Sequence, residues 1–331
     1  MTSPNLFNFA TKELSQDAVI CWLIAWAGAE AKGKAVEEEL RRCGRVLLDA
    51  LFRKWRDWGD VELDDYVRTE VLHQEQNIDV LARVNDRFVL LIEDKTNTAA
   101  HDDQLAKYWD LVTEGKTSLG TVDENHVYPI YFKTGNHSLR DRQHAEEQEY
   151  RAFDRSDFLS VLETYNGGNE ILLDFRRHLE RWEQDTHSFR QWTRDGAQWT
   201  NESKRASRGW EGFYRWVEEN CLDGGRDNWG PLGSLVGGYG GVWIETIETS
   251  RNSRFAIWLE KDRISIRLYG AKRKVSVTGM NRDKKYWAQA FDGRGSGSFT
   301  RPRRLQATRT KPMCVAEWRG WLVPVRKFLT C

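Results

Sequence analysis

The chain has no apolar run long enough to cross a bilayer. Its longest such run extends from Val19 to Ala29, about half of the roughly 20 residues that a transmembrane helix needs. Asp17, rather than a basic segment, precedes this run, which also disfavours a signal peptide. We therefore expect a soluble, cytoplasmic protein that has no membrane partner.

Cysteine is scarce, and two common ligand-binding motifs are missing. The five cysteines are scattered and never form a C-x-x-C pair, which disfavours both a disulfide framework and a zinc site. No G-x-G-x-x-G pattern follows a predicted strand, and the sequence ending at Gly115-Lys116-Thr117 lacks the earlier glycine of a P-loop. Nucleotide binding is therefore not indicated.

The composition is that of a globular protein. The 331 residues include 40% hydrophobic residues and 16 tryptophans spread along the chain, which argues against disorder. The mean hydropathy of -0.69 argues against a membrane protein. A chain of this length can bury a sizeable core, and we expect two domains.

The net charge is zero, with 50 basic and 50 acidic residues, but the charges are unevenly distributed. Residues 251–331 hold 20 Lys plus Arg against five Asp plus Glu, and residues 1–250 hold 30 against 45. Such asymmetry is a hint that one end of a chain contacts nucleic acid.

Hydrophobic periodicity predicts a mixed α/β fold in the N-terminal half, with helices flanking the sheet. The first helix is expected to use Ser15 as its N-cap, with Asp17 in the first turn. Asn85-Asp86-Arg87 separates two apolar runs, as in a hairpin that joins antiparallel strands. The other expected helices cover roughly 36–58, 105–112, 156–165 and 171–191, and the expected strands cover 66–72, 78–84, 88–92 and 127–132.

A polar segment, residues 193–208, is the expected domain boundary. We thus predict domains over 1–192 and 209–331, the second an α+β, strand-rich basic domain that binds nucleic acid. The glycine-rich segment 223–241 is interpreted as turns. The expected elements of the second domain are a helix over 209–222 and strands over 242–249, 255–260 and 263–269.

Three residues of the predicted hairpin suggest chemistry. On a strand, Glu93 and Lys95 project from one face while Asp94 points away. Asp79, on the preceding strand, is placed to converge with Glu93 across the hairpin. Two carboxylates on strands, with a backbone carbonyl and waters, form a hard-oxygen site for Mg²⁺ or Mn²⁺. A lysine beside such an ion suits metal-assisted phosphodiester hydrolysis, because it can orient the attacking water and offset charge on the phosphate.

An ordinary strand end is the alternative interpretation. An acidic residue two positions before a lysine occurs five times in the sequence, so the tripeptide means little by itself. Only the copy at Glu93 ends an apolar strand and follows a strand that carries an aspartate. On the residues alone, the catalytic site and the ordinary strand end are equally supported.

The ordered combination of Asp79, Glu93-x-Lys95 and Gln104-x-x-x-Tyr108 resembles the PD-(D/E)XK nuclease superfamily. In particular, the chain resembles a bacterial family whose members begin with a Phe-rich Glu-Leu-Ser-x-Asp-Ala segment, as residues 7–18 do here. The resemblance covers roughly residues 6–190. Asn77-Ile78, rather than a proline, precedes Asp79, but only the carboxylate is chemically required.

The resemblance implies a restriction-endonuclease-like fold and roles for individual residues. Asp79, Glu93 and the backbone carbonyl of Asp94 would bind the metal, and Lys95 would act on the water. An acidic residue of the first helix often adds a ligand in this family, so Glu13 or Asp17 could reach the ion. A helix-dipole partner for Asp17 and a solvated Glu13 are the alternatives. Gln104 and Tyr108 would touch the metal site or a DNA phosphate; for these two, an exposed glutamine and a packing tyrosine are the alternatives.

The resemblance also implies the activity, which is that of a Mg²⁺-dependent endodeoxyribonuclease. A role in defence against foreign DNA, as a homodimer or with partner subunits, would fit, and RNA is not excluded as a substrate. The alternative is a nuclease-derived DNA-binding or sensor protein without catalysis.

The basic C-terminal residues are expected to contact DNA. Residues 271–311 contain 12 Lys plus Arg and two acids, with aromatic residues between them, a pattern that fits phosphate contacts and base stacking. A solvated face, or a surface that docks on the acidic half, is the alternative. The predicted DNA contacts are Lys272, Arg273, Lys274, Lys284, Lys285, Arg301, Arg303 and Arg304.

Overall fold

The computed structural model divides the chain into two compact units, residues 1–185 and 186–331. The division falls near the end of one helix, and the helix that follows it begins inside the expected 193–208 boundary, at Lys204. The structure describes residues 4–10, 12–29, 33–55, 68–96, 104–191, 204–221, 229–233, 239–248, 253–260, 263–270 and 273–275. No helix among these residues is long and apolar enough to cross a membrane.

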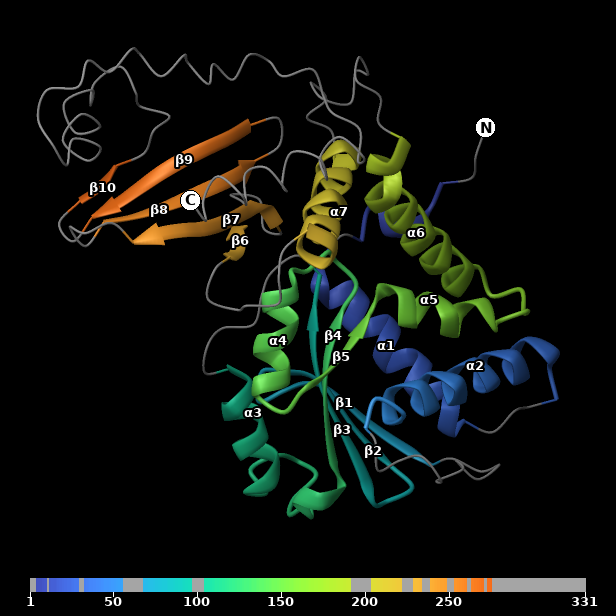
Figure 1. The fold of residues 1–331 in the computed structure, drawn as a ribbon. Coiled ribbons are helices and arrows are strands. Elements are labelled where there is room, and N and C mark those ends of the chain that lie inside the picture. The colour runs from blue at the N-terminus through green and yellow to red at the C-terminus, as the bar shows by residue number, and fades with distance from the viewer. Residues whose placement is uncertain are drawn as a thin grey trace, which may run out of the picture. The chain divides into compact units, whose positions relative to one another are not determined.

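The first unit is built on a mixed five-stranded sheet with the order β1-β2-β3-β4-β5 (Figure 1). The first three strands form an antiparallel meander, whereas β4 runs parallel to β3, and β5 runs parallel to β4. The strands are β1 (Thr69–Glu75), β2 (Ile78–Val84), β3 (Phe88–Lys95), β4 (Val127–Lys133) and β5 (Arg151–Asp154).

Helices cover both faces of this sheet. Side chains of α1, α2, α5 and α6 pack with alternate residues of β2, β3 and β4 in one core cluster, and this side of the sheet is called the α1 face below. The opposite side packs against α3 and α4 in a second cluster. It is called the catalytic face below, after the residues predicted to be catalytic, Glu93 and Lys95, which project from it. The helices are α1 (Glu13–Gly28), α2 (Ala35–Phe52), α3 (Gln104–Thr113), α4 (Leu139–Glu147), α5 (Arg155–Glu163) and α6 (Glu170–His187).

The two-sided core explains the sequence of the central strand. Seven of the eight residues of β3 are buried, because a strand covered by helices on both faces buries both sets of alternating side chains. Leu90 and Ile92 point to the α1 face, whereas Val89 and Leu91 point to the catalytic face. Glu93 and Lys95 continue the second set, and Asp94 continues the first.

Several expected elements differ from those observed. Ser15 is not the N-cap, because α1 begins at Glu13 with Lys12 at the cap, so Asp17 lies beyond the first turn. The second helix ends at Phe52 rather than at residue 58. Strand β1 begins three residues later than expected, at Thr69. Two short elements, α4 and β5, were not predicted, because neither shows a long periodic pattern.

In the second unit, helix α7 (Lys204–Cys221) accompanies a five-stranded antiparallel sheet with the order β10-β9-β8-β7-β6. Gly212 of α7 lies close to the Thr186 backbone; a methyl group at this glycine would overlap the Thr186 carbonyl. The interpretation of segment 223–241 as turns alone was wrong, because β6 forms within it. The strands are β6 (Trp229–Gly233), β7 (Tyr239–Glu248), β8 (Ser253–Glu260), β9 (Arg263–Gly270) and β10 (Arg273–Val275).

Most of the predicted DNA contacts lie outside the described residues. Arg273 and Lys274 belong to the short strand β10, where they pair with Gly270 and Tyr269 of β9. The predicted contacts that lie outside the described residues are Lys272, Lys284, Lys285, Arg301, Arg303 and Arg304.

Candidate active site

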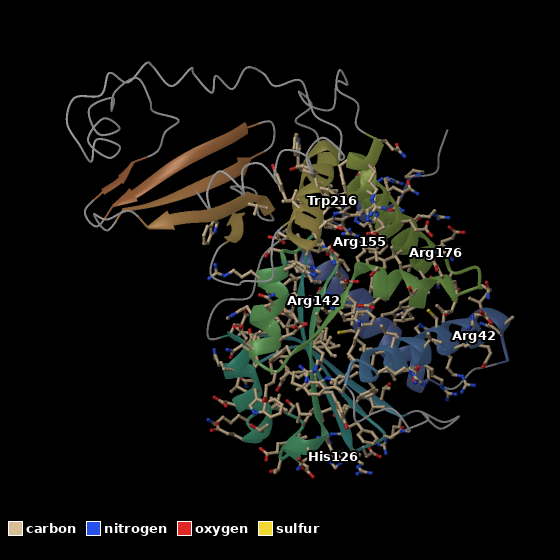
Figure 2. The ribbon with its side chains drawn as sticks, in the orientation of Figure 1. Arg42, His126, Arg142, Arg155, Arg176 and Trp216 are labelled. Atoms are coloured by element: carbon tan, nitrogen blue, oxygen red, sulfur yellow. The ribbon has the colours of Figure 1, made fainter. Side chains whose placement is uncertain are left out.

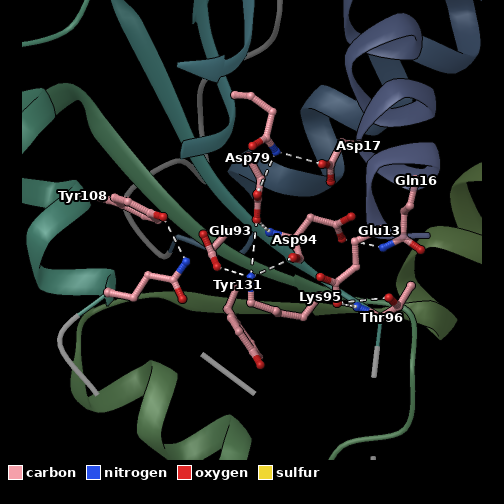
Figure 3. Close-up of polar contacts among 12 residues, drawn as sticks. Glu13, Gln16, Asp17, Asp79, Glu93, Asp94, Lys95, Thr96, Tyr108 and Tyr131 are labelled. Atoms are coloured by element: carbon pink, nitrogen blue, oxygen red, sulfur yellow. Dashed lines mark hydrogen bonds and ion pairs between the residues drawn. The ribbon is translucent and has the colours of Figure 1, made fainter. Parts of the chain in front are cut away.

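The antiparallel pairing of β2 and β3 brings the predicted catalytic residues together. Val80 pairs with Ile92 in the strand register, so Asp79 and Glu93 occupy the next positions along the two strands. Glu93 and Lys95 lie on one face of β3, as the alternation predicts. Figure 3 shows the Asp79 and Glu93 carboxylates both directed toward the Lys95 ammonium group.

Lys95 is the cation between two carboxylates. Its Nζ donates a hydrogen bond to Glu93 Oε1 and lies 3.5 Å from Asp79 Oδ2. Nζ also lies 3.2 Å from the backbone carbonyl oxygen of Asp94. All three charged side chains are largely enclosed, with exposed fractions of 0% for Glu93, 10% for Lys95 and 16% for Asp79. The three predicted residues therefore form one enclosed charged cluster.

Burial sets the protonation chemistry of this cluster. Desolvation, helped by repulsion from Asp79, raises the pKa of Glu93 to about 8. Desolvation alone would lower the pKa of Lys95, but attraction to Glu93 and Asp79 outweighs it and raises the pKa above its ordinary value. Lys95 therefore stays protonated at neutral pH, and the site holds a fixed cation.

Asp94 links the two faces of the sheet. Its backbone N–H donates to Asp79 Oδ2 at 2.9 Å on the catalytic face, while its carboxyl is fully buried on the α1 face. There Gln16 Nε2 donates to Asp94 Oδ1. Desolvation and the neighbouring Asp17 carboxyl raise the pKa of Asp94 well above its ordinary value.

The two acidic residues of α1 occupy different positions beside the site. Glu13 Oε1 accepts hydrogen bonds from the Thr96 backbone N–H at 2.9 Å and from Thr96 Oγ1 at 3.0 Å, just after Lys95. Asp17 is buried beside Asp94, and desolvation raises its pKa. Gln74 bridges Asp17 and Asp79, because its Nε2 donates to Asp17 Oδ2 at 3.1 Å and to Asp79 Oδ1 at 3.0 Å. Of the two, Glu13 is the one that contacts the residue directly after Lys95.

Gln104 and Tyr108 face each other one helical turn apart on α3. Gln104 Nε2 donates to Tyr108 Oη at 2.9 Å. Tyr108 is only 4% exposed and belongs to the core cluster of the catalytic face. Burial raises its pKa, and the nearby Glu93 and Asp79 carboxylates add to that effect. The structure thus brings this pair to the same side of the sheet as the charged cluster (Figure 3).

Several polar residues around the site were not predicted. On β4, Tyr131 and Lys133 pair with Glu93 and Lys95 and so share their face. Lys133 Nζ contacts Asp141 Oδ2 at 2.5 Å. Strand alternation could have placed these two β4 residues, but their partner on α4 depends on packing. Gln16, Gln74 and Thr96 were not predicted either, because each is a lone polar side chain that no motif marks.

The donor set fits a hard divalent cation. Asp79 and Glu93 supply carboxylate oxygens, and Glu93 Oε2 is buried without a hydrogen-bond partner, which leaves a costly orphan acceptor. A cation bound there would satisfy this oxygen and oppose the repulsion between the two carboxylates. Among the described residues, no group of three or more His, Cys, Asp or Glu side chains is arranged to hold a metal ion. A metal would therefore be bound by two carboxylates, completed by the Asp94 carbonyl and waters.

Comparison with known proteins gives one family. The family model described as the PD-(D/E)XK nuclease superfamily matches residues 4–209, well over half of the chain. No curated protein and no solved structure matches the chain significantly. The matched region contains the whole five-stranded sheet of the first unit and every residue of the charged cluster described above.

Proposed function

The chain belongs to the PD-(D/E)XK nuclease superfamily, and from that premise we propose that it is a Mg²⁺-dependent endodeoxyribonuclease. The observation that carries this proposal is the charged cluster at the end of β3. Glu93 is fully buried with one orphan oxygen, Asp79 faces it, and Lys95 lies between them. A binding protein without catalysis has no need of two converging carboxylates and a buried lysine, whose desolvation is costly.

Asp79, Glu93 and the Asp94 carbonyl would hold the metal, and Glu13 is a further candidate from α1. When bound, a divalent cation lowers the pKa of a coordinated water and offsets negative charge on the phosphate. Mn²⁺ suits the same oxygen donors. Asp17 is a weaker candidate ligand, because its carboxylate is buried beside Asp94 and is bridged to Asp79 by Gln74.

The protonated state of Lys95 defines its role. A lysine that keeps its proton cannot accept one from water, so Lys95 acts as a hydrogen-bond donor and fixed positive charge. It orients the attacking water and stabilises charge that develops on the phosphate oxygens. Tyr108 and Gln104 would hold a DNA phosphate at the edge of the same site, through the hydroxyl and amide groups that now bond to each other.

The second unit would supply DNA affinity. Residues 186–331 hold 27 Lys plus Arg against 14 Asp plus Glu, whereas residues 1–185 hold 23 against 36. The acidic catalytic unit would repel a polyanion, so a basic unit on the same chain is a natural source of phosphate contacts. We also propose a biological role, which is defence against foreign DNA. The protein would act in the cytoplasm, as a homodimer or with partner subunits.

The test is a cleavage assay with purified protein on supercoiled plasmid, linear DNA and single-stranded RNA. Mg²⁺, Mn²⁺ or EDTA is added, and Asp79→Ala and Lys95→Ala are assayed beside the wild type. We expect metal-dependent cleavage of DNA that both substitutions abolish. DNA binding without cleavage under all conditions would favour the non-catalytic sensor instead, and equal cleavage by wild type and variants would refute the assignment of the site.

A further inference from the structure

The polar side chains of α1 that face the sheet have positions that the cleavage chemistry does not explain. Gln16 is a buried amide, 4% exposed, and with Asp17 it is one of two polar residues that α1 buries beside its apolar ones. Its Nε2 donates to Asp94 Oδ1, and its Oε1 accepts a hydrogen bond from Thr134 Oγ1. Gln16 thus bridges the ends of two neighbouring strands, β3 and β4.

The Asp94 backbone is the part of the site to which this bridge is connected. Its N–H holds Asp79 Oδ2 at 2.9 Å, and its carbonyl oxygen lies beside Lys95 Nζ. The amide of Gln16 donates to Oδ1 of the Asp94 carboxyl, and the same carboxyl shares a hydrogen bond with the Asp17 carboxyl. Without the amide, Oδ1 of this fully buried carboxyl would lose its amide donor, and a shift of the strand end would relieve that loss.

The other end of the bridge is itself fixed. The Thr134 backbone N–H donates to the Lys95 carbonyl at 3.2 Å, and the Thr134 carbonyl accepts from Arg155 Nη1 at 2.5 Å. Arg155, labelled in Figure 2, is 6% exposed and also donates to Glu183 on α6. Gln16 therefore ties Asp94 to a rigid, buried network rather than to a mobile side chain.

We propose that Gln16 is a positioning residue for the metal-binding site, an inference that rests on the proposed function. It acts through Asp94, from the face of the sheet opposite to the reaction. Through Asp94 it fixes the positions of both the Asp79 carboxylate and the Asp94 carbonyl. Outer-shell hydrogen bonds of this kind typically change metal affinity or activity about 10- to 100-fold when removed.

The experiment compares Gln16→Met with a matched control, Asn5→Ala. Methionine keeps the length of the side chain but removes the amide. Asn5 is also a buried amide with two hydrogen bonds, to Asp174 and Phe7, and neither partner belongs to the site. Mn²⁺ binding is measured by electron paramagnetic resonance without DNA, and amide exchange of the Asp94 peptide is measured in EDTA.

We expect Gln16→Met to weaken Mn²⁺ binding about tenfold or more and to speed exchange at Asp94, while Asn5→Ala changes only thermal stability. If Gln16→Met does not fold, Thr134→Val tests the same bridge from its other end, with weaker Mn²⁺ binding again expected. Wild-type Mn²⁺ affinity in a folded variant of either residue overturns the positioning role alone. A wild type that neither binds Mn²⁺ nor cleaves DNA overturns the proposed function and this inference with it.

Discussion

The Asp94 N–H donates to Asp79 Oδ2 at 2.9 Å on the catalytic face, although the Asp94 side chain lies buried on the α1 face. This one peptide joins the two faces of the sheet. The alternation of a strand makes such a link possible, because adjacent residues point to opposite faces while sharing one backbone. On the proposed function, we therefore expect the site to be sensitive both to residues that would touch DNA and to residues that pack behind the sheet.

Removing the buried cation should abolish cleavage with little effect on DNA binding. We expect Lys95→Met to lower the rate of plasmid cleavage about 100- to 1000-fold, because the variant has no fixed charge to stabilise the transition state. The measurement is single-turnover cleavage at saturating Mg²⁺. Lys116→Met is the matched control, since Lys116 is an exposed lysine paired with Glu114. An equal fall in rate in both variants would contradict the role of Lys95.

The close packing of α1 against α2 should be sensitive to a single methyl group. A Cβ at Gly44 would lie 2.8 Å from Ala27 N and closer still to Leu23 O, so Gly44→Ala forces the two helices apart. We expect a decrease of about 1–3 kcal/mol in the free energy of unfolding, measured by urea denaturation. Gly168→Ala is the control, because nothing lies within 4 Å of a Cβ there. Equal stability of both variants would show that the helices are not closely packed.

The thiol of Cys43 should resist alkylation in the folded protein. Cys43 is fully buried on α2, and desolvation raises the pKa of its thiol to about 12. Because the thiolate is the reactive form, only a minute fraction reacts at pH 8. Iodoacetamide labelling followed by peptide mass spectrometry, with and without urea, checks this. Rapid labelling of Cys43 without urea would mean that the core around α2 is open.

Neutralising two basic residues of the second unit should weaken DNA binding in a salt-dependent way. We expect Arg303→Gln with Arg304→Gln to reduce the slope of log affinity against log salt by about 0.9 for each DNA phosphate that the protein no longer neutralises. Fluorescence anisotropy at several salt concentrations measures this slope. The control variant, Arg53→Gln with Arg68→Gln, removes the same charge from exposed positions of the first unit. A slope unchanged from wild type would indicate that the basic segment is a solvated surface and does not contact DNA.

Local rules were enough to predict the centre of the site. The period of two along β3 places Glu93 and Lys95 on one face, and a hairpin brings Asp79 beside them; the register of Val80 with Ile92 confirms that arrangement. The strand β4 was also predicted, because its apolar run is short and continuous, although its parallel pairing with β3 was not. The parts of the fold that follow from strand alternation and hairpin pairing were therefore predictable.

The contribution of α1 was not predictable, because it depends on how the helix is rotated against the sheet. Glu13 and Asp17 share a helical face, yet Glu13 reaches Thr96 while Asp17 lies beside Asp94. Gln16, between them, has no motif that marks it. The N-cap prediction also failed: Ser15 is a favourable cap by residue type, but the observed N-cap, Lys12, lies three residues earlier, and Glu13 in the first turn accepts the Thr96 hydrogen bonds.

The central claim is that Glu93 is a metal-binding carboxylate of a nuclease, and Glu93→Gln tests it most directly. Glutamine keeps the size of the buried side chain and removes its ability to ionise, so the sheet should remain folded. The measurement is the rate of plasmid cleavage by folded wild type and variant in Mg²⁺ and in EDTA. We predict cleavage by wild type in Mg²⁺ only and a rate about 100-fold lower, or lower still, in Glu93→Gln. Cleavage by the variant at the wild-type rate, or wild-type cleavage that persists in EDTA, would contradict the account.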